Sequence, residues 1–130
     1  MLLQFNIFPI IFLQFVQFRI FTVIHRCYAA LPASPVAVGT VEVTETTVRL
    51  IWASGDYGPV DPTVTYSIAY QEVDGGSVTE REVSDILATE YRITGLTAYT
   101  SYLFRVMAVN NVGRSLPSTP LEVTTDQLGQ

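Results

Sequence analysis

Beyond residue 30, apolar and polar side chains alternate along a series of short segments. Successive side chains of a β-strand point to opposite faces, so this alternation predicts half-buried strands. We expect strands at residues 38–43, 48–52, 64–70, 79–83, 90–93, 102–109 and 121–125. Gly, Asn, Asp and Pro, which favour turns, separate most of these segments. Seven short strands in about 95 residues predict an all-β fold, an antiparallel sandwich of two sheets.

The same alternation assigns side chains to the core or to the surface. Those expected to point inward are Val41, Val43, Val48, Leu50, Trp52, Tyr66, Ile68, Tyr70, Tyr91, Ile93, Leu96, Tyr102, Phe104, Val106, Ala108, Leu121 and Val123. Three arginines one position away from core residues then point outward. We expect them to pair across strands with acidic side chains: Arg49, Arg92 and Arg105 with Glu42, Glu90 or Glu122.

The first thirty residues differ in composition from the rest and hold six of the seven phenylalanines. Their apolar run, residues 5–24, is long enough to cross a bilayer, but it contains Arg19. An arginine near the centre of a membrane helix costs roughly 2.5–3.5 kcal/mol, which disfavours a transmembrane helix. A secretory leader, a signal anchor and a segment foreign to the native protein stay open, with a buried amphipathic helix as a further alternative.

These alternatives leave membrane association through residues 1–30 open. We expect residues 31–126 to form the single domain of the chain and residues 127–130 to form a short tail. All twelve acidic residues but only five of the seven arginines fall within this domain, which gives it a charge of about −7. Such a surface repels phosphate backbones, so a nucleic acid is not an expected partner. The chain contains no lysine, so arginine must make any cationic contact.

One cysteine, Cys27, and one histidine, His25, are present. A single cysteine excludes an internal disulfide and a multi-cysteine zinc site. No second histidine is available to act as a base or to complete a metal site. We therefore expect no cofactor and no metal.

Three stretches carry a resemblance to a known family: "VRLIW", "YSIAY" and "ITGLTAYTSYLFRVMAVNNVGRSLPS". Over residues 31–126 the chain resembles a fibronectin type III domain, a seven-stranded immunoglobulin-like sandwich. In that family a leucine and a tyrosine six residues later frame the corner before the sixth strand, and here these are Leu96 and Tyr102. Ala98 departs from the family, which commonly has proline at that position.

The segments "VEVTETTVRLIWASGD" and "AVNNVGRSLPS" are most similar to the first such repeat of receptor tyrosine phosphatases of the leukocyte-common-antigen-related type. In those receptors the repeats lie outside the cell. The resemblance implies a non-catalytic protein-binding or spacer module of a cell-surface adhesion or receptor protein. It would contact a protein partner or neighbouring extracellular domains. The alternative is an ectodomain fragment of such a phosphatase, involved in adhesion signalling.

Catalysis is not expected from the chain itself. The phosphatases use adjacent His and Cys followed by Gly and Arg, whereas here Arg26 separates His25 from Cys27 and the glycine is missing. Two acidic side chains, Glu80 and Glu82, share one face of a predicted strand. Charges at a sheet edge commonly guard against aggregation, and we prefer that interpretation to a catalytic carboxylate pair.

Four residues are expected to have structural roles: Trp52, Tyr66, Leu96 and Tyr102. The Tyr102 hydroxyl should bond to main chain a few residues upstream. Loops carry function more often than strands do, so the loops at 53–63 and 110–115 are the candidate sites for partner contacts. Within them we select Asp56, Tyr57, Asn111 and Arg114. Arg114, the one cation of the second loop, is the leading candidate.

Overall fold

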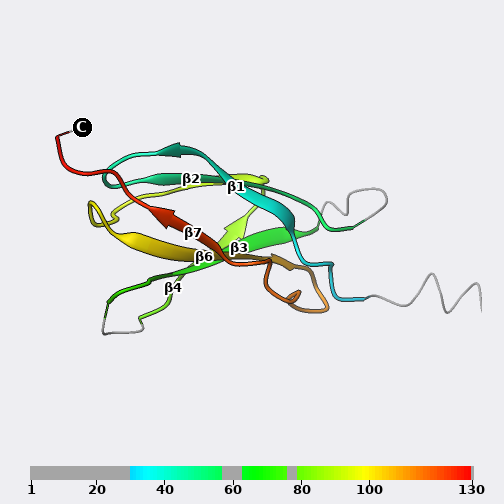
Figure 1. Cartoon of the computed structure of the whole chain (residues 1–130). Helices are drawn as coiled ribbons and strands as arrows, with labels where there is room; N and C mark the ends of the chain where they lie inside the picture. The colour runs from blue at the N-terminus through cyan, green and yellow to red at the C-terminus, as the bar shows by residue number, and fades with distance from the viewer. Residues whose placement is uncertain (1–29, 57–62, 76–78, 130) are drawn as a thin grey trace, which may run out of the picture. The chain divides into compact units, whose positions relative to one another are not determined.

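Seven β-strands make up the regular structure of the part of the chain that the computed structural model describes, residues 30–56, 63–75 and 79–129 (Figure 1). Their bounds are β1 (Val36–Val43), β2 (Val48–Ala53), β3 (Thr65–Glu72), β4 (Arg81–Ile86), β5 (Glu90–Ile93), β6 (Ser101–Val109) and β7 (Leu121–Thr124). Each predicted strand is present, with ends that shift by up to three residues. The predicted turn at 73–78 falls partly outside the described residues.

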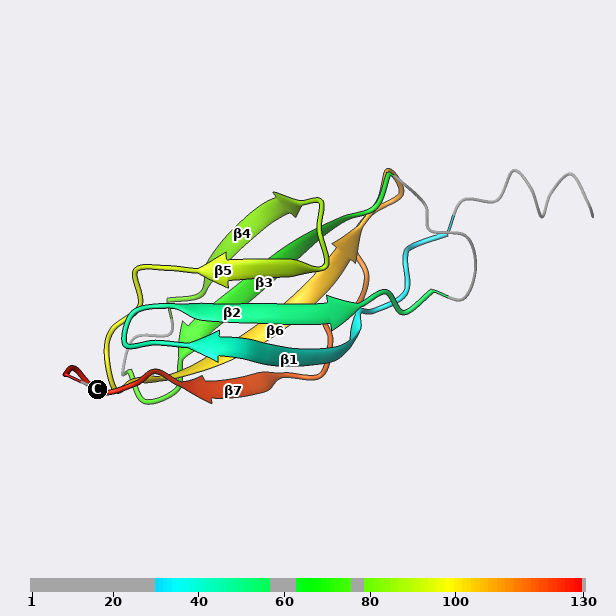
Figure 2. The same cartoon turned by 90° about the horizontal axis from the view of Figure 1, so that it is seen from above.

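The strands form two antiparallel sheets that face each other (Figures 1 and 2). One sheet has three strands in the order β1-β2-β5, and the other has four in the order β4-β3-β6-β7. β2 and β3 follow each other in the chain but lie in different sheets, as do β4 and β5, and β5 and β6. This crossing between layers confirms the predicted sandwich.

The core lies between the two sheets and is built from alternate side chains of their strands. It consists of Val48, Leu50, Trp52, Tyr66, Ile68, Tyr70, Ile86, Ile93, Leu96, Tyr102, Phe104, Val106 and Ala108. Val43, Leu121 and Val123 are partly buried against it. The long strands β3 and β6 pair in register from Thr65 opposite Val109 to Glu72 opposite Tyr102, which brings their inward side chains together.

Two side chains assigned to the core are exposed instead. The register of β1 passes from Thr40 opposite Leu50 to Glu42 opposite Arg49, so Val41 is the additional residue of a β-bulge. Its side chain is 52% exposed. Tyr91 lies opposite Leu50 and so on the inner face, but β5 is an edge strand and leaves the ring 36% exposed.

A bulge on β4 explains a core residue that the alternation missed. On β4, Ile86 lies opposite Tyr66 and Val83 lies opposite Ile68, so both point inward although they are three positions apart. Asp85, between them, has a positive φ of 61°. The alternation of inward and outward side chains is broken at this point. The sequence pattern therefore ends the strand at residue 83, whereas β4 continues to Ile86. β4 is an edge strand, as expected for its charged sequence.

Candidate functional site

Tyr102 stands at the corner where the chain passes from β5 in one sheet to β6 in the other, and only 2% of its surface is exposed. Its hydroxyl accepts a hydrogen bond from Thr97 N at 2.9 Å and donates one to Glu72 Oε1 at 3.2 Å. Leu96 is buried at the same corner, and its N–H donates to Thr46 O. Both side chains are committed to contacts within the sandwich.

Trp52 and Tyr66 meet in the core, one from each sheet. Their rings are 5.4 Å apart in an edge-to-face arrangement, which favours the aromatic quadrupoles. Each has 5% of its surface exposed, so neither offers a face on which a ligand could stack. The indole Nε1 of Trp52 is buried and has no hydrogen-bond partner among the described residues.

The loop after β2 contains the first pair of candidate contact residues. Asp56 does not project freely, because its Oδ1 accepts a hydrogen bond from Ala33 N at 3.2 Å. The neighbouring Gly55 packs so closely that a Cβ at this position would lie 2.1 Å from Ser34 O. Gly55 and Asp56 are therefore fastened to the segment that precedes β1. Tyr57 lies outside the described residues.

The loop after β6 contains the second pair of candidates. Asn110 Oδ1 accepts hydrogen bonds from Val112 N at 2.9 Å and from Gly113 N at 3.1 Å, which closes the turn locally. Asn111 is exposed and is free of hydrogen-bond partners within the described residues. Of the candidates in the described part of the chain, Asn111 alone is free of an internal contact.

Arg114 is half-exposed but is already paired. Its Nη2 donates to Glu82 Oε1 at 2.6 Å, and its Nη1 donates to Glu82 Oε2 at 3.4 Å. Nη1 also lies 4.0 Å from the Met107 sulfur. The sequence did not predict this pair, because the partners are 32 residues apart and belong to a loop and to the far edge strand β4.

The Arg114 guanidinium holds the pKa of Glu82 below its usual value of 4.5, and the hydroxyls of Ser84 and Ser67 lower this pKa further. Burial acts in the opposite direction and is outweighed. A carboxyl group whose pKa is lowered by folding stabilises the protein above its unfolded pKa, and this contribution disappears as the pH falls through the lowered value.

The Glu82→Gln variant is therefore expected to be less stable than the unmodified chain at neutral pH, by about 0.2–1 kcal/mol because the pair is largely exposed. The difference should close as the pH falls below the lowered pKa of Glu82. Denaturant unfolding at both pH values measures it. Glu45→Gln is the matched control, since Glu45 makes no hydrogen bond or ion pair in the described residues. A difference that persists in acid would contradict the ion pair as its cause.

Two buried serines, which precede β7 in the chain, bind the edge of β6 beyond the residues that pair with β7. Ala108 N donates to Ser115 Oγ and Val106 N donates to Ser118 Oγ, each at 3.0 Å. The backbone N–H groups of the same serines donate to Ala108 O and Val106 O. Each serine thus satisfies both polar groups of one β6 residue, as a neighbouring strand would. Sequence reasoning treated these serines only as turn residues.

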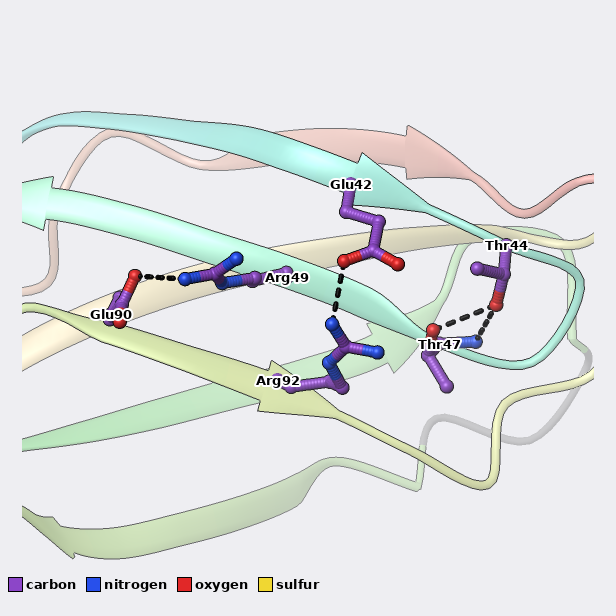
Figure 3. Close-up of polar contacts among 6 residues, drawn as sticks. All are labelled: Glu42, Thr44, Thr47, Arg49, Glu90 and Arg92. Carbon is purple, nitrogen blue, oxygen red and sulfur yellow. Dashed lines mark hydrogen bonds and ion pairs between the residues drawn. The ribbon is translucent and has the colours of Figure 1, made fainter.

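The outer face of the three-stranded sheet carries two further ion pairs (Figure 3). Arg49 donates to Glu90 at 2.7 Å, and Arg92 on β5 reaches across β2 to Glu42 on β1 at 2.6 Å. These pairs confirm the prediction for Arg49 and Arg92. Arg49 and Arg92 lie directly opposite each other, an arrangement that is unfavourable without nearby carboxylates. The third predicted arginine, Arg105, has no ion pair among the described residues.

No cluster of three His, Cys, Asp or Glu side chains within the described ranges has the arrangement of a metal site. The described residues also include no helix that could span a bilayer. His25 and Cys27 lie outside these ranges.

A two-sheet antiparallel sandwich of this strand order, closed by a buried tyrosine at the β5–β6 corner, defines an immunoglobulin-like β-domain. The sequence model of the fibronectin type III domain matches residues 33–124. The chain therefore belongs to the fibronectin type III family.

Receptor phosphatases are among its curated relatives. The receptor-type tyrosine-protein phosphatase F of Danio rerio is 41% identical over 98 residues, and the tyrosine-protein phosphatase Lar of Drosophila melanogaster is 38% identical over 98 residues. Each alignment covers 75% of this chain and 5% of the relative, so the chain spans a small part of the proteins that it matches. These findings confirm the resemblance seen in the sequence.

Solved structures share the fold. The fibronectin type-III domain of human fibronectin type III domain containing protein 3 has a TM-score of 0.66 at 26% identity, and the alignment covers 77% of this chain and 91% of that one. The FN5 domain of Drosophila Lar has a TM-score of 0.60 at 23% identity, covering 74% and 98%. The latter likeness concerns the fold alone.

Proposed function

We propose that this domain is a non-catalytic protein-binding or spacer module of a cell-surface adhesion or receptor protein. The observation that carries the proposal is the 41% identity to a 98-residue part of a receptor-type phosphatase, because the matched region is the sandwich. Its extracellular position, its contacts with a protein partner or neighbouring domains, and its lack of catalysis are parts of the same proposal. Asp56, Tyr57, Asn111 and Arg114 are retained as proposed contact residues.

The internal contacts of the two loops favour a spacer role alongside binding. Asp56 is bonded to the segment before β1, and the serines after Arg114 are bonded to β6. Residues held in this way lose little conformational freedom when a partner binds. Such contacts also suit a module that sets the distance between its neighbours.

A domain exchange tests the proposal. Residues 31–126 would replace the matching repeat in the Drosophila phosphatase Lar, and the chimaera would be expressed in cultured cells. We expect it to reach the cell surface in amounts close to those of the unmodified receptor. The control carries Trp52→Ala within the exchanged domain and should be retained inside the cell. Retention of both chimaeras would contradict a role as an extracellular module.

The non-catalytic part of the proposal has a separate test. The full chain should not hydrolyse a generic aryl phosphate above the rate in buffer, since the order of His25, Arg26 and Cys27 does not match the phosphatase loop. The Cys27→Ser variant is the control. Turnover by the unmodified chain that is lost in this variant would overturn the assignment.

The second candidate is that the chain is an ectodomain fragment of a receptor-type tyrosine phosphatase. The similarity to several such receptors favours it. A transcript that continues beyond Gln130 into further fibronectin repeats and a phosphatase signature would establish this alternative. A transcript that ends there without them would exclude it.

A further inference from the structure

The two sheets differ in whether their outward-pointing arginines form ion pairs. On the three-stranded sheet, Arg49 and Arg92 each have a carboxylate partner. On the four-stranded sheet, Arg105 of β6 lies opposite Ala69 on the outer face. Arg105 is partly buried, and no carboxylate or other hydrogen-bond partner is found for it in the described part of the chain. A guanidinium in that setting retains all five of its donors.

The Arg114–Glu82 ion pair crosses this same face. Arg114 contacts Met107 on β6 and bonds to Glu82 on β4, and β3 lies between these strands. The residues of β3 in that interval are Ser67, opposite Met107, and Ala69, opposite Glu82. The ion pair therefore spans β3 across two small side chains.

The small side chains beneath the pair are buried although they lie on an outer sheet face. Ser67 is 1% exposed, while Ala69 and Met107 are each 5% exposed. The Ser67 hydroxyl is buried close enough to the Glu82 carboxylate to help lower its pKa, although no hydrogen bond of good geometry is formed by it among the described residues.

We propose that the outer face of the four-stranded sheet, centred on Ser67, binds a carboxylate-bearing segment of a protein partner through Arg105 and Arg114. Glu82 shows how such a carboxylate is held, since it takes two donors from Arg114 and one from Ser84 on this face. Planar guanidinium groups suit bidentate binding of carboxylates. The inference rests on the proposed protein-binding role and specifies its surface.

The net negative charge of the domain favours some anionic partners over others. Twelve acids against five arginines repel a polyanion such as a sulfated glycan or a nucleic acid. On this face itself, Glu82 and Glu122 accompany the two arginines, with Glu122 opposite Leu103. A protein segment with separated carboxylates meets the arginines individually and avoids much of that repulsion. In this arrangement Glu82 competes with the partner for Arg114.

The test titrates the full chain with a capped peptide that carries two glutamates separated by uncharged residues, and follows the Nε–H signals of the arginine side chains by NMR. We expect saturable shifts at Arg105 and Arg114 and none at Arg49 or Arg92. Arg105→Gln should weaken binding about tenfold or more, the effect of losing a charge-assisted hydrogen bond. Arg105→Lys, which keeps the charge but not the planar guanidinium group, should weaken peptide binding less. Circular dichroism verifies that each variant is folded.

A matched pair of variants separates the proposed surface from net charge. Glu82→Gln frees Arg114 and is expected to tighten peptide binding several-fold. Glu90→Gln frees Arg49 on the other sheet, with the same change in charge, and should leave binding unchanged. Equal tightening in both variants, or no saturable shift at Arg105, would overturn the proposal. Tighter binding of a sulfated oligosaccharide than of the peptide would also overturn it.

These outcomes are distinct from those of the domain exchange. A chimaera that reaches the cell surface while the peptide fails to bind would remove the surface assignment and leave the proposed module intact. A chimaera that is retained inside the cell would contradict the proposed role as an extracellular module.

Discussion

Replacement of Trp52 by alanine is expected to lower the free energy of unfolding by about 3–5 kcal/mol, because the indole fills the core and would leave a cavity. Domains of this size are commonly stable by about 5–15 kcal/mol, so the loss is a large fraction of the total. The indole packs edge-to-face on Tyr66, and this contact is lost as well. Trp52 is the only tryptophan, so circular dichroism rather than fluorescence must follow the unfolding.

The matched variant is Trp52→Phe, which keeps an aromatic ring in the core. Its cost should be far smaller than that of the alanine variant, since the indole N–H has no partner to lose. A loss below about 1 kcal/mol for Trp52→Ala would contradict the core position of this side chain.

Tyr102→Phe is expected to destabilise the domain by about 1–3 kcal/mol, since it deprives the Thr97 N–H of its acceptor at the corner. The packing of the ring between the sheets is retained, so the measured loss reports the hydroxyl. Chemical denaturation with a two-state fit gives the difference in stability.

Tyr70→Phe is a close control for this experiment. Tyr70 is also buried, and its ring stacks on Phe104 at a centroid distance of 5.7 Å. Its hydroxyl makes no hydrogen bond within the described residues. The same atom is removed without breaking a bond, so the expected change is near zero. Equal losses in the two variants would show that the corner bond contributes nothing specific.

The sequence pattern predicted strands, sheets and most of the core because alternation reports local strand geometry. It failed where a bulge adds one residue to a strand. Val41 was placed inside although it is the additional residue of β1, and Ile86 was missed because the bulge of β4 precedes it. Bulges depend on pairing with a neighbouring strand, which a single-strand pattern does not contain.

The candidate contact residues show the same limit more strongly. Loop position and charge selected Arg114 correctly as a surface residue, but its bond to Glu82 joins residues 32 positions apart. The serines that complete the edge of β6 look like ordinary turn residues in the sequence. By contrast, the pairs of Arg49 and Arg92 were predictable, because both follow from alternation on neighbouring strands.

Hydrogen bonds from Ala33 and Ser34 attach the segment before β1 to two loops. Ala33 bonds to Asp56 in the β2–β3 loop, and the Ser34 hydroxyl donates to Leu116 O in the β6–β7 loop at 2.8 Å. Tension applied to the chain just before Ala33 would therefore load these two bonds, and through them both sheets, before it reached the ladder between β1 and β2. Their rupture would release the few residues before β1, roughly 10–15 Å of extended chain, while the sandwich stayed folded. The attachment would act as a short mechanical buffer that extends under load before the domain unfolds.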